Sequence, residues 1–343
     1  MAINKKVTIH IRDEINVTLV GMQEKHMTKL YNEFAIKDKN CFFKPTYKLG
    51  RWDGFYRFVS MTGQTYIYFI DKIVPMLVKW GYKINVKDER VASYIEFDPI
   101  KEDIFGHISN EWGDPYLLRD YQCEAVNAVL QNGGGIMIAG TGAGKTIMSA
   151  AITHSYGQRG LRCITIVPST TLVVQSSADF KTWGLDAGQY CGDTKELGAT
   201  HLVTTWQSLQ NVPHILKDFD VLIVDECHGA KANVLADLLK NHGSHIAHRY
   251  GMTGTMPKDE YESQKVLLSL GDIQYEITAA MLIDAGFLST IEINILQLME
   301  EFDDGYFPDY ASETAYLRGS KERIQWIANL AAQITSKEKS NTL

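Results

Sequence analysis

The chain has 343 residues, of which 45% are hydrophobic and 22% are charged, so it is long enough to form two domains with separate cores. It has no apolar run of about 18 residues, and its N-terminus, MAINKKVTIHIRDEINV, lacks the apolar centre of a signal peptide, which argues against a membrane span and against secretion. Its five cysteines are scattered and none forms a C-x-x-C pair, which argues against a disulfide framework and a zinc site. The composition therefore predicts a cytoplasmic protein with no membrane partner.

The net charge of −7 argues against a nucleic-acid partner, but the charges are unevenly distributed. Residues 1–100 carry 16 basic and 11 acidic side chains, a net charge of +5, whereas residues 101–343 carry 18 and 30, a net charge of −12. Such an asymmetry favours contact between the first hundred residues and a polyanion. A net charge of +5 over 100 residues is also unremarkable, so charge alone leaves both interpretations open.

The first hundred residues show strand and helix patterns of moderate length. Alternating hydrophobicity, helical spacing and glycine turns predict, in chain order, strands at 5–11 and 15–20, a helix at 23–36, strands at 55–59 and 65–69, a helix at 71–80 and a strand at 82–86. These elements predict a small α+β domain over residues 1–100. The mixed sequence that follows, with Gly106 and Gly113, indicates a linker at 101–114.

The stretch KPTYKLGRWDGFYRF, residues 44–58, combines five aromatic residues with four basic ones. Aromatic side chains stack on bases and basic side chains contact phosphates, which suggests an accessory DNA-binding surface. Its candidate DNA contacts are Lys48, Arg51, Trp52 and Arg57. The alternative is structural, because aromatic residues that alternate along a strand more often face a core. Trp52 in particular fits either base stacking or the shaping of a glycine-flanked turn.

From residue 115 the pattern changes to strands that are apolar throughout and alternate with helices. Strands are predicted at 135–139, 163–168, 201–206, 221–226 and 250–254, with helices at 119–131, from 145 and at 170–182. Such a succession indicates an α/β fold with a doubly wound parallel sheet. Residues 276–290 predict a helix and turn that close this domain, which we place at 115–300, and a further helix is predicted from about 319.

A glycine-rich turn follows the first of these strands. The segment IMIAGTGAGKT, residues 136–146, fits the P-loop pattern except that Ala139 stands at its first position. In such a turn backbone N–H groups bind phosphates at the positive end of a helix, a lysine neutralises the β and γ phosphates, and a hydroxyl ligates Mg²⁺. The predicted ATP-binding residues of this turn are Gly140, Thr141, Gly142, Ala143, Gly144, Lys145 and Thr146.

The strand VLIV, residues 221–224, ends in two carboxylates, Asp225 and Glu226. Two carboxylates at the end of a buried strand are unfavourable unless a cation is bound. We therefore predict that Asp225 and Thr146 hold Mg²⁺ and that Glu226 orients and deprotonates the attacking water. Lys145, Asp225 and Glu226 are the predicted catalytic residues.

The tetrad DECH, with AGTGAGKT upstream, resembles the superfamily 2 helicases and translocases, in which Ala is common at the first P-loop position. Further segments follow in family order, namely LLRDYQ (117–122), PSTTLVVQ (168–175), TTWQSL (204–209), GMTGT (251–255) and LIDAGFLS (282–289). The resemblance implies a RecA-like fold for the P-loop domain.

The same resemblance implies roles for individual residues. Arg119 and Gln122 would recognise adenine, and His228 would also contact ATP. The coupling of nucleotide state to strand movement is implied for Thr253, Gly254 and Thr255. The implied nucleic-acid contacts are Pro168, Ser169, Thr170, Gln175, Thr205, Trp206 and Gln207.

Within this family, the first hundred residues are similar to the N-terminal domain of the UvsW-type phage helicases. The shared pattern is P-x-Y-x-x-G-x-W-D-G, here Pro45 to Gly54, and the stretch KERIQWIANLA (321–331) is also similar. The resemblance implies a DNA helicase of the host cytoplasm that uses ATP and Mg²⁺ to unwind and branch-migrate junctions in recombination and repair. Restriction-enzyme motors and XPB-like repair translocases share only the motor motifs.

Superfamily 2 motors use two RecA-like lobes, and the second lobe supplies arginines to the γ-phosphate. Its signature, Q-x-x-G-R-x-x-R, does not occur in this sequence, and Arg318 in YLRGSKER lacks the preceding glutamine. We therefore expect a chain truncated after the first lobe, with residues 301–343 forming a linker and the start of an incomplete second lobe. Because an arginine finger contributes about 10³–10⁵ in rate, we expect weak ATP binding and very slow hydrolysis.

Two other functions remain open from the sequence. One is a double-stranded DNA translocase of the restriction or repair type, which would use the same ATP site without separating strands. The other is an ATP-gated DNA-binding module, in which the nucleotide site is only a structural clamp. A P-loop kinase or GTPase does not explain the DECH tetrad together with TGT and LRDYQ.

Overall fold

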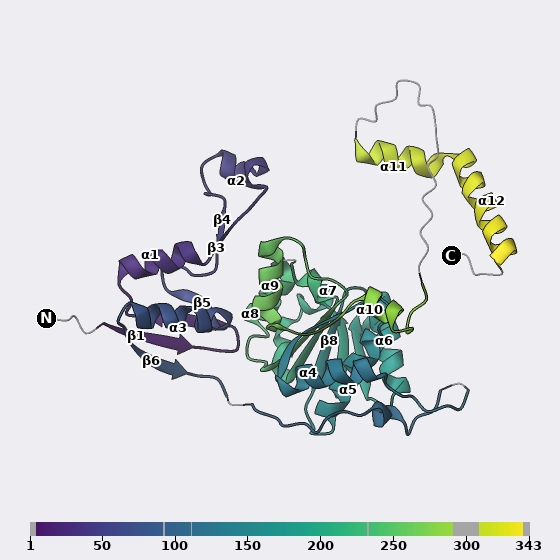
Figure 1. Ribbon diagram of the computed structural model, residues 1–343, viewed down its shortest axis with the longest axis horizontal. Helices are drawn as coiled ribbons and strands as arrows, with labels where there is room; N and C mark the ends of the chain where they lie inside the picture. The colour runs from purple at the N-terminus through teal and green to yellow at the C-terminus, as the bar shows by residue number, and fades with distance from the viewer. Residues whose placement is uncertain (1–4, 92, 111, 232, 291–308, 339–343) are drawn as a thin grey trace. The chain divides into compact units, whose positions relative to one another are not determined.

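The computed structural model describes residues 5–91, 93–110, 112–231, 233–290 and 309–338 (Figure 1). The chain divides into two compact units, residues 1–290 and residues 291–343. The larger unit carries two separate sheets and a two-stranded ribbon, and the described part of the smaller unit carries two helices. None of the described helices is both long enough and apolar enough to cross a membrane.

A four-stranded sheet with two helices forms the N-terminal part of the larger unit. Its elements are β1 (Lys6–Ile11), β2 (Asn16–Val20), α1 (Glu24–Glu33), β5 (Gln64–Tyr66), α3 (Ile70–Lys79) and β6 (Lys83–Asp88). The spatial order is β5-β2-β1-β6, and only β1 and β6 are parallel neighbours. Alternate strand residues such as Ile9 and Val17 are buried with Leu30 of α1 and Leu77 of α3. The predicted α+β region is therefore confirmed.

A two-stranded antiparallel ribbon lies between α1 and β5 in the chain. β3 (Ala35–Lys37) pairs with β4 (Phe55–Arg57), and the residues between them form the 3-10 turn η1 (Cys41–Phe43) and the short helix α2 (Pro45–Lys48). We call residues 38–54 the ribbon tip; Figure 1 shows α2 at the end of the ribbon. The predicted strand at 55–59 ends at residue 57, because the next two residues turn into the core.

The second sheet has eight strands in the spatial order β10-β9-β11-β8-β12-β13-β7-β14. The strands are β7 (Gly134–Ala139), β8 (Cys163–Val167), β9 (Ala187–Cys191), β10 (Thr194–Lys195), β11 (His201–Thr205), β12 (Val221–Asp225), β13 (His248–Thr253) and β14 (Ile273–Ile277). All neighbours are parallel except β9 and β10, which confirms the predicted parallel sheet.

Helices cover both faces of this sheet, as a doubly wound fold requires. They are α4 (Asp120–Gln131), α5 (Lys145–Gly157), α6 (Thr170–Thr182), α7 (Trp206–Leu209), α8 (Asn233–Asn241), α9 (Glu260–Leu270) and α10 (Ala279–Asp284). One apolar core joins α4, α5 and α6 to the sheet, and a second joins α7, α8 and α9 to it. In β7, Met137 faces the first core while Ile136 and Ile138 face the second.

A buried arginine joins this sheet to two of its helices. The guanidinium of Arg249, in β13, donates to the carbonyls of Gly243 and, at 3.2 Å, Leu239, and its Nε donates to the carbonyl of Ser269 at 2.7 Å. These carbonyls lie at the C-terminal ends of α8 and α9, where helical partners are missing. A cation at that position also interacts favourably with both helix dipoles.

The structure differs from the sequence prediction mainly at sheet edges. β5 ends at Tyr66, and residues 67–69, predicted as strand, form a 3-10 turn. The helix predicted over 276–290 begins later, because Glu276 and Ile277 complete β14. β9 and β10 were not predicted. Edge strands are short and partly polar, so their alternation in the sequence is weak.

The smaller unit contains α11 (Tyr310–Gly319) and α12 (Lys321–Glu338) in its described part. The helix predicted from about 319 is thus confirmed by α12. The predicted linker and start of a second lobe, residues 301–343, lie partly outside the described residues, as does the end of the predicted domain at 115–300. The proposed domain boundaries stay predictions.

Candidate ATP site and nucleic-acid surfaces

The P-loop connects the end of β7 to the start of α5. Gly142 and Gly144 have φ values of 82° and 80°, a left-handed conformation that residues with a side chain rarely adopt. Gly144 precedes the first turn of α5, where backbone N–H groups lack helical partners. The turn therefore directs N–H groups and the positive end of a helix toward one point, which is the geometry that binds phosphate.

The start of α4 holds the backbone of the P-loop. Gln122 donates from Nε2 to the carbonyl of Ala143 at 2.9 Å, and the hydroxyl of Tyr121 donates to the same oxygen at 3.0 Å. A Cβ atom at Gly144 would lie only 2.4 Å from Gln122 Nε2. A side chain here would therefore displace the Gln122 amide from the Ala143 carbonyl, so packing as well as backbone conformation favours glycine.

The two residues implied in adenine recognition lie together at this end of α4. Gln122 is buried, and its Oε1 accepts from the backbone N–H of Arg119 at 2.9 Å. The guanidinium of Arg119 lies 5.2 Å from the ring centre of Phe287, whose ring is 5.0 Å from that of Tyr121. Sequence reasoning singled out neither aromatic residue, although the segment LIDAGFLS contains Phe287. Tyr121 is buried behind Phe287, whereas Arg119 is exposed and Phe287 is partly exposed, so a cation and one aromatic ring beside the P-loop are accessible to a base.

Lys145 and the two strand-end carboxylates are brought together. Lys145 Nζ lies 3.3 Å from Glu226 Oε1 and 3.4 Å from the carbonyl oxygen of Ala139. Asp225 Oδ1 accepts from the backbone N–H of Glu226 at 2.9 Å. Burial, and next the Glu226 carboxylate, raise the pKa of Asp225 above its ordinary value. A bound cation would relieve this penalty, so Asp225, with Thr146 in the first turn of α5, fits Mg²⁺.

Glu226 has an unusual backbone conformation. Its φ of 48° is the one positive value among the non-glycine residues that the structure describes. Such a conformation costs on the order of 1–2 kcal/mol for a residue with a side chain. The carboxylate lies between two donors, with Oε1 facing Lys145 and Oε2 at 3.2 Å from His228 Nδ1. The strained residue is the predicted general base, and unusual backbone conformations concentrate at functional sites.

His228 links this carboxylate to the TGT segment. Its Nδ1 is 2.9 Å from Thr253 Oγ1, and the Thr253 hydroxyl donates to the carbonyl of Thr255 at 2.9 Å. Because that hydroxyl has one proton, it accepts from His228, which therefore carries a proton on Nδ1. The same N–H faces Glu226. Gly254 lies in the turn between the two threonines.

The two segments implied in nucleic-acid contact line one groove of about 600 Å³ at the carboxyl ends of β8 and β11. The predicted residues in this groove are Pro168, Ser169, Thr170, Thr205 and Gln207. Ser169 and Thr205 also cap α6 and α7, because each side-chain oxygen accepts from the helix backbone, at 3.3 Å and 3.2 Å.

Two predicted contacts lie elsewhere. Gln175 is exposed further along α6, and Trp206 packs against the apolar core on the α7 face. Lys195 of β10 lines the groove and was not predicted, because β10 itself was not recognised from the sequence.

The four predicted DNA contacts of residues 44–58 have different surroundings. Lys48 and Arg51 are exposed, and no ion pair within the described chain involves them. Arg57 forms an ion pair with Asp53. Trp52 is half-buried, and its Nε1 donates to the backbone carbonyl three residues later, at 2.9 Å. The bond from Trp52 supports its structural role, whereas the two exposed cations are accessible to a ligand.

The N-terminal region contacts the α8 and α9 side of the large sheet. The ring of Tyr56 stacks on that of Tyr261 in α9, with 3.7 Å between centres and planes 9° apart. Lys240 at the end of α8 donates from Nζ to the hydroxyl of Tyr66 at 3.0 Å. The side-chain amide of Asn16 donates to the carbonyl of Lys240 at 3.2 Å.

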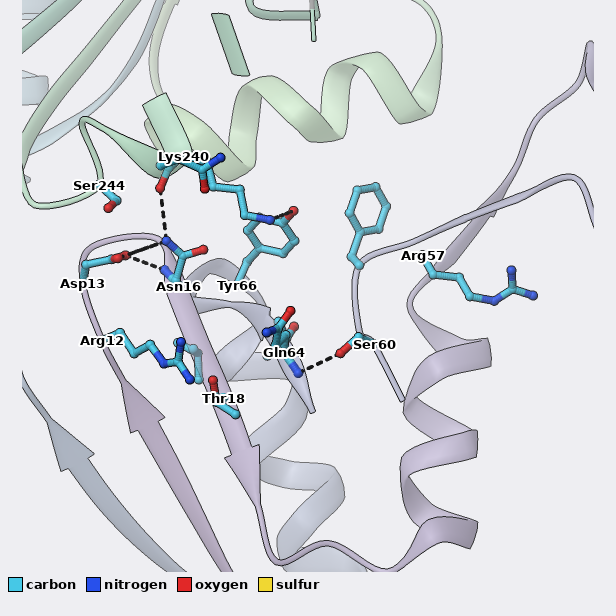
Figure 2. Close-up of a pocket in the computed structure, with 14 residues that line it drawn as sticks. Arg12, Asp13, Asn16, Thr18, Arg57, Ser60, Gln64, Tyr66, Lys240 and Ser244 are labelled. Atoms are coloured by element: carbon cyan, nitrogen blue, oxygen red, sulfur yellow. Dashed lines mark hydrogen bonds between the residues drawn. The ribbon is translucent and has the colours of Figure 1, made fainter. Parts of the chain in front are cut away.

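A pocket of about 480 Å³ lies at this junction, and Figure 2 shows Lys240 reaching toward Tyr66 above Asn16. The side chains that line it include Arg12, Asn16, Thr18, Arg57, Gln64 and Lys240. Three of these are cations. Asp13 is the one carboxylate in the lining, and its Oδ1 accepts from the backbone N–H of Asn16 at 2.7 Å. Cations, amides and a hydroxyl are the groups that contact a nucleic-acid backbone. Of this set, sequence reasoning named only Arg57.

A P-loop, paired strand-end carboxylates and a groove at the carboxyl ends of the sheet strands are the features of a nucleotide-binding P-loop lobe, and they resemble those of helicases and translocases. The family model described as "Type III restriction enzyme, res subunit" matches residues 115–258. The chain is 24% identical over 355 residues to the ATP-dependent DNA helicase uvsW of Enterobacteria phage T4, which covers 97% of this chain and 69% of that protein.

Two further comparisons agree. The DNA 3'-5' translocase XPB2 of Sulfurisphaera tokodaii is 28% identical over 174 residues, which cover 47% of this chain and 36% of that protein. The crystal structure of T4 UvsW matches with a TM-score of 0.62 and 18% identity, over 97% of this chain and 68% of that one. The resemblance to superfamily 2 helicases of the UvsW type, and the RecA-like fold, are thereby confirmed.

Proposed function

We propose that this chain contains the ATP-binding lobe of a DNA helicase that acts on branched DNA, unwinding junctions and migrating branches in recombination and repair. The observation that carries the proposal is the series of contacts from Lys145 through Glu226 and His228 to Thr253. It joins a phosphate-binding loop to the segment expected to couple nucleotide state to movement. A polar groove for nucleic acid lies at the carboxyl ends of the same sheet.

The residues of the ATP site divide the work between binding and proton transfer. Backbone N–H groups of residues 140–144 and the Lys145 ammonium would bind the phosphates, and Thr146 and Asp225 would hold Mg²⁺, which would neutralise phosphate charge. Glu226 accepts a proton from the attacking water at its carboxylate. Lys145 contacts one oxygen of that carboxylate and His228 contacts the other, so both orient it.

His228 and Thr253 supply the coupling. The Nδ1 proton of His228 faces both the Glu226 carboxylate and the Thr253 hydroxyl, so a change in the charge near Glu226 alters the bond to Thr253. Thr253 ends β13 and is tied to Thr255 in the following turn. A local change at the general base therefore has a direct route to the TGT turn and to α9 beyond it.

The N-terminal region is our reason for proposing branched DNA, and not linear duplex, as the substrate. The similarity to uvsW extends over 97% of the chain, whereas that to XPB2 covers 47%. The N-terminal region adds a cationic pocket and the exposed pair Lys48 and Arg51 to the motor lobe. Additional surfaces of this kind let one protein hold more than one arm of a junction. A duplex translocase without strand separation is the second candidate.

The chain by itself is proposed to be a very slow ATPase. The described residues form one RecA-like sheet, and the arginine signature of a second lobe does not occur in the sequence. An arginine finger contributes about 10³–10⁵ in rate. An ATP-gated DNA-binding module is therefore the third candidate for the activity of these 343 residues.

The test measures nucleotide binding, ATP turnover and DNA binding by the whole chain. Equilibrium binding of a fluorescent ATP analogue with Mg²⁺ is compared between wild type, Lys145→Ala and Glu226→Gln. Binding of a four-way junction, a fork, a linear duplex and a single strand is then measured by anisotropy at fixed salt, because affinities without a salt concentration cannot be compared.

We expect Lys145→Ala to weaken nucleotide binding by at least tenfold and Glu226→Gln to leave it nearly unchanged. We also expect the junction and fork to bind more tightly than the linear duplex. Tighter binding of the linear duplex would favour the translocase. ATP turnover by Glu226→Gln at the wild-type rate would show that Glu226 is not the general base.

A further inference from the structure

The ribbon tip exposes large apolar side chains that the functional argument above does not use. Phe43 is 79% exposed, Phe42 is 55% exposed and Leu49 is 65% exposed. They come from η1 and from the residue after α2, so they lie within one short excursion of the chain. Phenylalanine is usually buried, and neighbouring exposed apolar side chains mark a contact surface.

The tip has its own internal structure. Cys41 is fully buried, and a Cβ at Gly54 would lie 3.1 Å from its Sγ. The Lys44 ammonium lies 2.7 Å from the Asp38 carboxylate, and the backbone N–H of Asp38 donates to the carbonyl of Gly54 at 2.9 Å. Exposure of the two phenylalanines thus belongs to a folded turn. A surface that is already ordered loses less conformational entropy when it binds.

The charges around these side chains identify the partner. Residues 37–58 contain six basic and two acidic side chains, although the whole chain has a net charge of −7. Both acidic residues are already paired, Asp38 with Lys44 and Asp53 with Arg57. Lys48 and Arg51 remain exposed beside the apolar residues. Aromatic side chains surrounded by cations are the combination that binds unpaired nucleotides, through base stacking and phosphate contacts.

We propose that Phe42 and Phe43 stack on unpaired bases at the branch point of a DNA fork or junction, with Lys48 and Arg51 on the adjoining phosphates. The inference rests on the proposed function and names the part of the DNA that the ribbon tip binds. It differs from the sequence-based choice of Trp52, whose indole N–H is bonded inside the turn and whose ring faces Tyr56 at 5.0 Å. A paired duplex offers no free base faces, so the tip distinguishes branched from linear DNA.

The experiment uses the whole chain and a fork with 2-aminopurine at the first unpaired position. Wild type is compared with Phe42→Ala/Phe43→Ala, and with Val78→Ala as a matched control, because Val78 is 62% exposed on α3 of the same region. Lys48→Ala/Arg51→Ala tests the phosphate contacts separately. Urea midpoints of all variants check folding.

We expect the double phenylalanine variant to bind the fork about tenfold more weakly, to bind fully paired duplex within twofold of wild type, and to lose the 2-aminopurine signal. Its dependence of log affinity on log salt should stay that of wild type, because no charge is removed. The Lys48 and Arg51 variant should instead reduce that slope, by about 0.7–0.9 for each phosphate that the protein no longer neutralises.

The results distinguish a failure of this inference from a failure of the proposed function. If wild type binds fork and duplex in a salt-dependent way and the phenylalanine variant matches it on both, the inference is wrong and the tip is free for a protein partner. If the variant weakens fork and paired duplex equally, the contact is with the backbone and base stacking is also excluded. If wild type binds no DNA at any salt, the proposed function and this inference fail together.

Discussion

The ATP site and the ribbon tip place their functional groups in opposite ways. At the ATP site, Lys145, Glu226, His228 and Thr253 contact one another, so each group is oriented by a protein partner. At the ribbon tip, Phe42, Phe43 and the nearby cations Lys48 and Arg51 face solvent. The first arrangement suits chemistry, which needs fixed geometry, and the second suits contact with a ligand whose shape varies.

The largest expected effect tests the ATP side of this comparison. Glu226→Gln keeps the size of the side chain but removes the proton acceptor. We expect hydrolysis, measured in the assembled motor or as the slow turnover of this chain, to fall by about 10²–10⁴. Nucleotide affinity should stay within a few-fold of wild type. A rate loss below tenfold would mean that the water is deprotonated elsewhere.

A glycine pair tests how closely the P-loop is packed. Gly144 and Gly160 both have left-handed φ values. An added Cβ at Gly144 would lie 2.4 Å from Gln122 Nε2, whereas one at Gly160 would have no atom within 4 Å. We expect Gly160→Ala to cost about 1 kcal/mol of unfolding free energy, from backbone conformation alone. Gly144→Ala should cost more and should also lose nucleotide binding. Equal costs in urea unfolding would contradict the packing argument.

We expect the Asp225 carboxylate to lower the stability of the fold while it serves metal binding. Its pKa is raised in the folded chain, by burial first and by Glu226 next, so the folded state disfavours the ionised form that predominates at pH 7. We expect Asp225→Asn to raise the unfolding free energy at pH 7, within the roughly 0.5–2 kcal/mol of single stabilising substitutions. The gain should disappear as the pH falls below the unfolded pKa of aspartate, where the wild-type group is protonated in both states.

The effect of Mg²⁺ on melting temperature provides a control for the Asp225→Asn experiment. With nucleotide present, Mg²⁺ should raise the melting temperature of wild type but not that of Asp225→Asn, because ligand binding to the native state alone is stabilising. Destabilisation at pH 7 would show that the carboxylate is favourably solvated in the folded chain.

The smallest expected effect concerns the junction pocket. Arg12 has no side-chain bond or ion pair within the described chain, whereas Lys240 donates to Tyr66. We therefore expect Arg12→Ala to leave stability within about 0.5 kcal/mol and to weaken DNA binding a few-fold, with a salt slope lower by about one phosphate contact. Anisotropy titrations from low to high salt check this. If the slope of log affinity against log salt is unchanged, Arg12 does not contact a DNA phosphate.

Sequence reasoning found the parts of the site that local spacing determines. Asp225 ends β12 and Glu226 follows it directly, while Lys145 follows β7 across the glycine turn. A strand followed by a glycine turn or by paired carboxylates is visible in one short window of sequence. The contact between His228 and Thr253 joins positions 25 residues apart, and no local pattern reports which neighbouring strand brings them together. The resemblance named both residues but not the hydrogen bond.

At the ribbon tip, sequence reasoning named Trp52 as the aromatic candidate, although other aromatic residues there are more exposed. A pattern of aromatic residues cannot tell which ones are buried, because Trp52 and Phe43 are equally apolar in the sequence. Their exposures are set by the fold, in which Trp52 finds a backbone acceptor and Phe43 finds no ring partner within the described chain. The edge strands β10 and β14 were missed because most of their residues are not buried, so their hydrophobic pattern is weak. β9 is buried but begins with alanine and glycine, which are depleted in strands.

Arg249 has a consequence for local unfolding. One guanidinium donates to carbonyls at the ends of α8 and α9. Opening either helix end therefore exposes a buried cation and leaves the carbonyls at the end of the other helix without their donor. We expect the backbone amides of both helices to exchange with deuterium as one cooperative unit. Because the N-terminal region rests on Lys240 of α8 and Tyr261 of α9, its attachment should share the same protection. The arginine thus sets how independently the N-terminal region can fluctuate from the lobe that carries the P-loop.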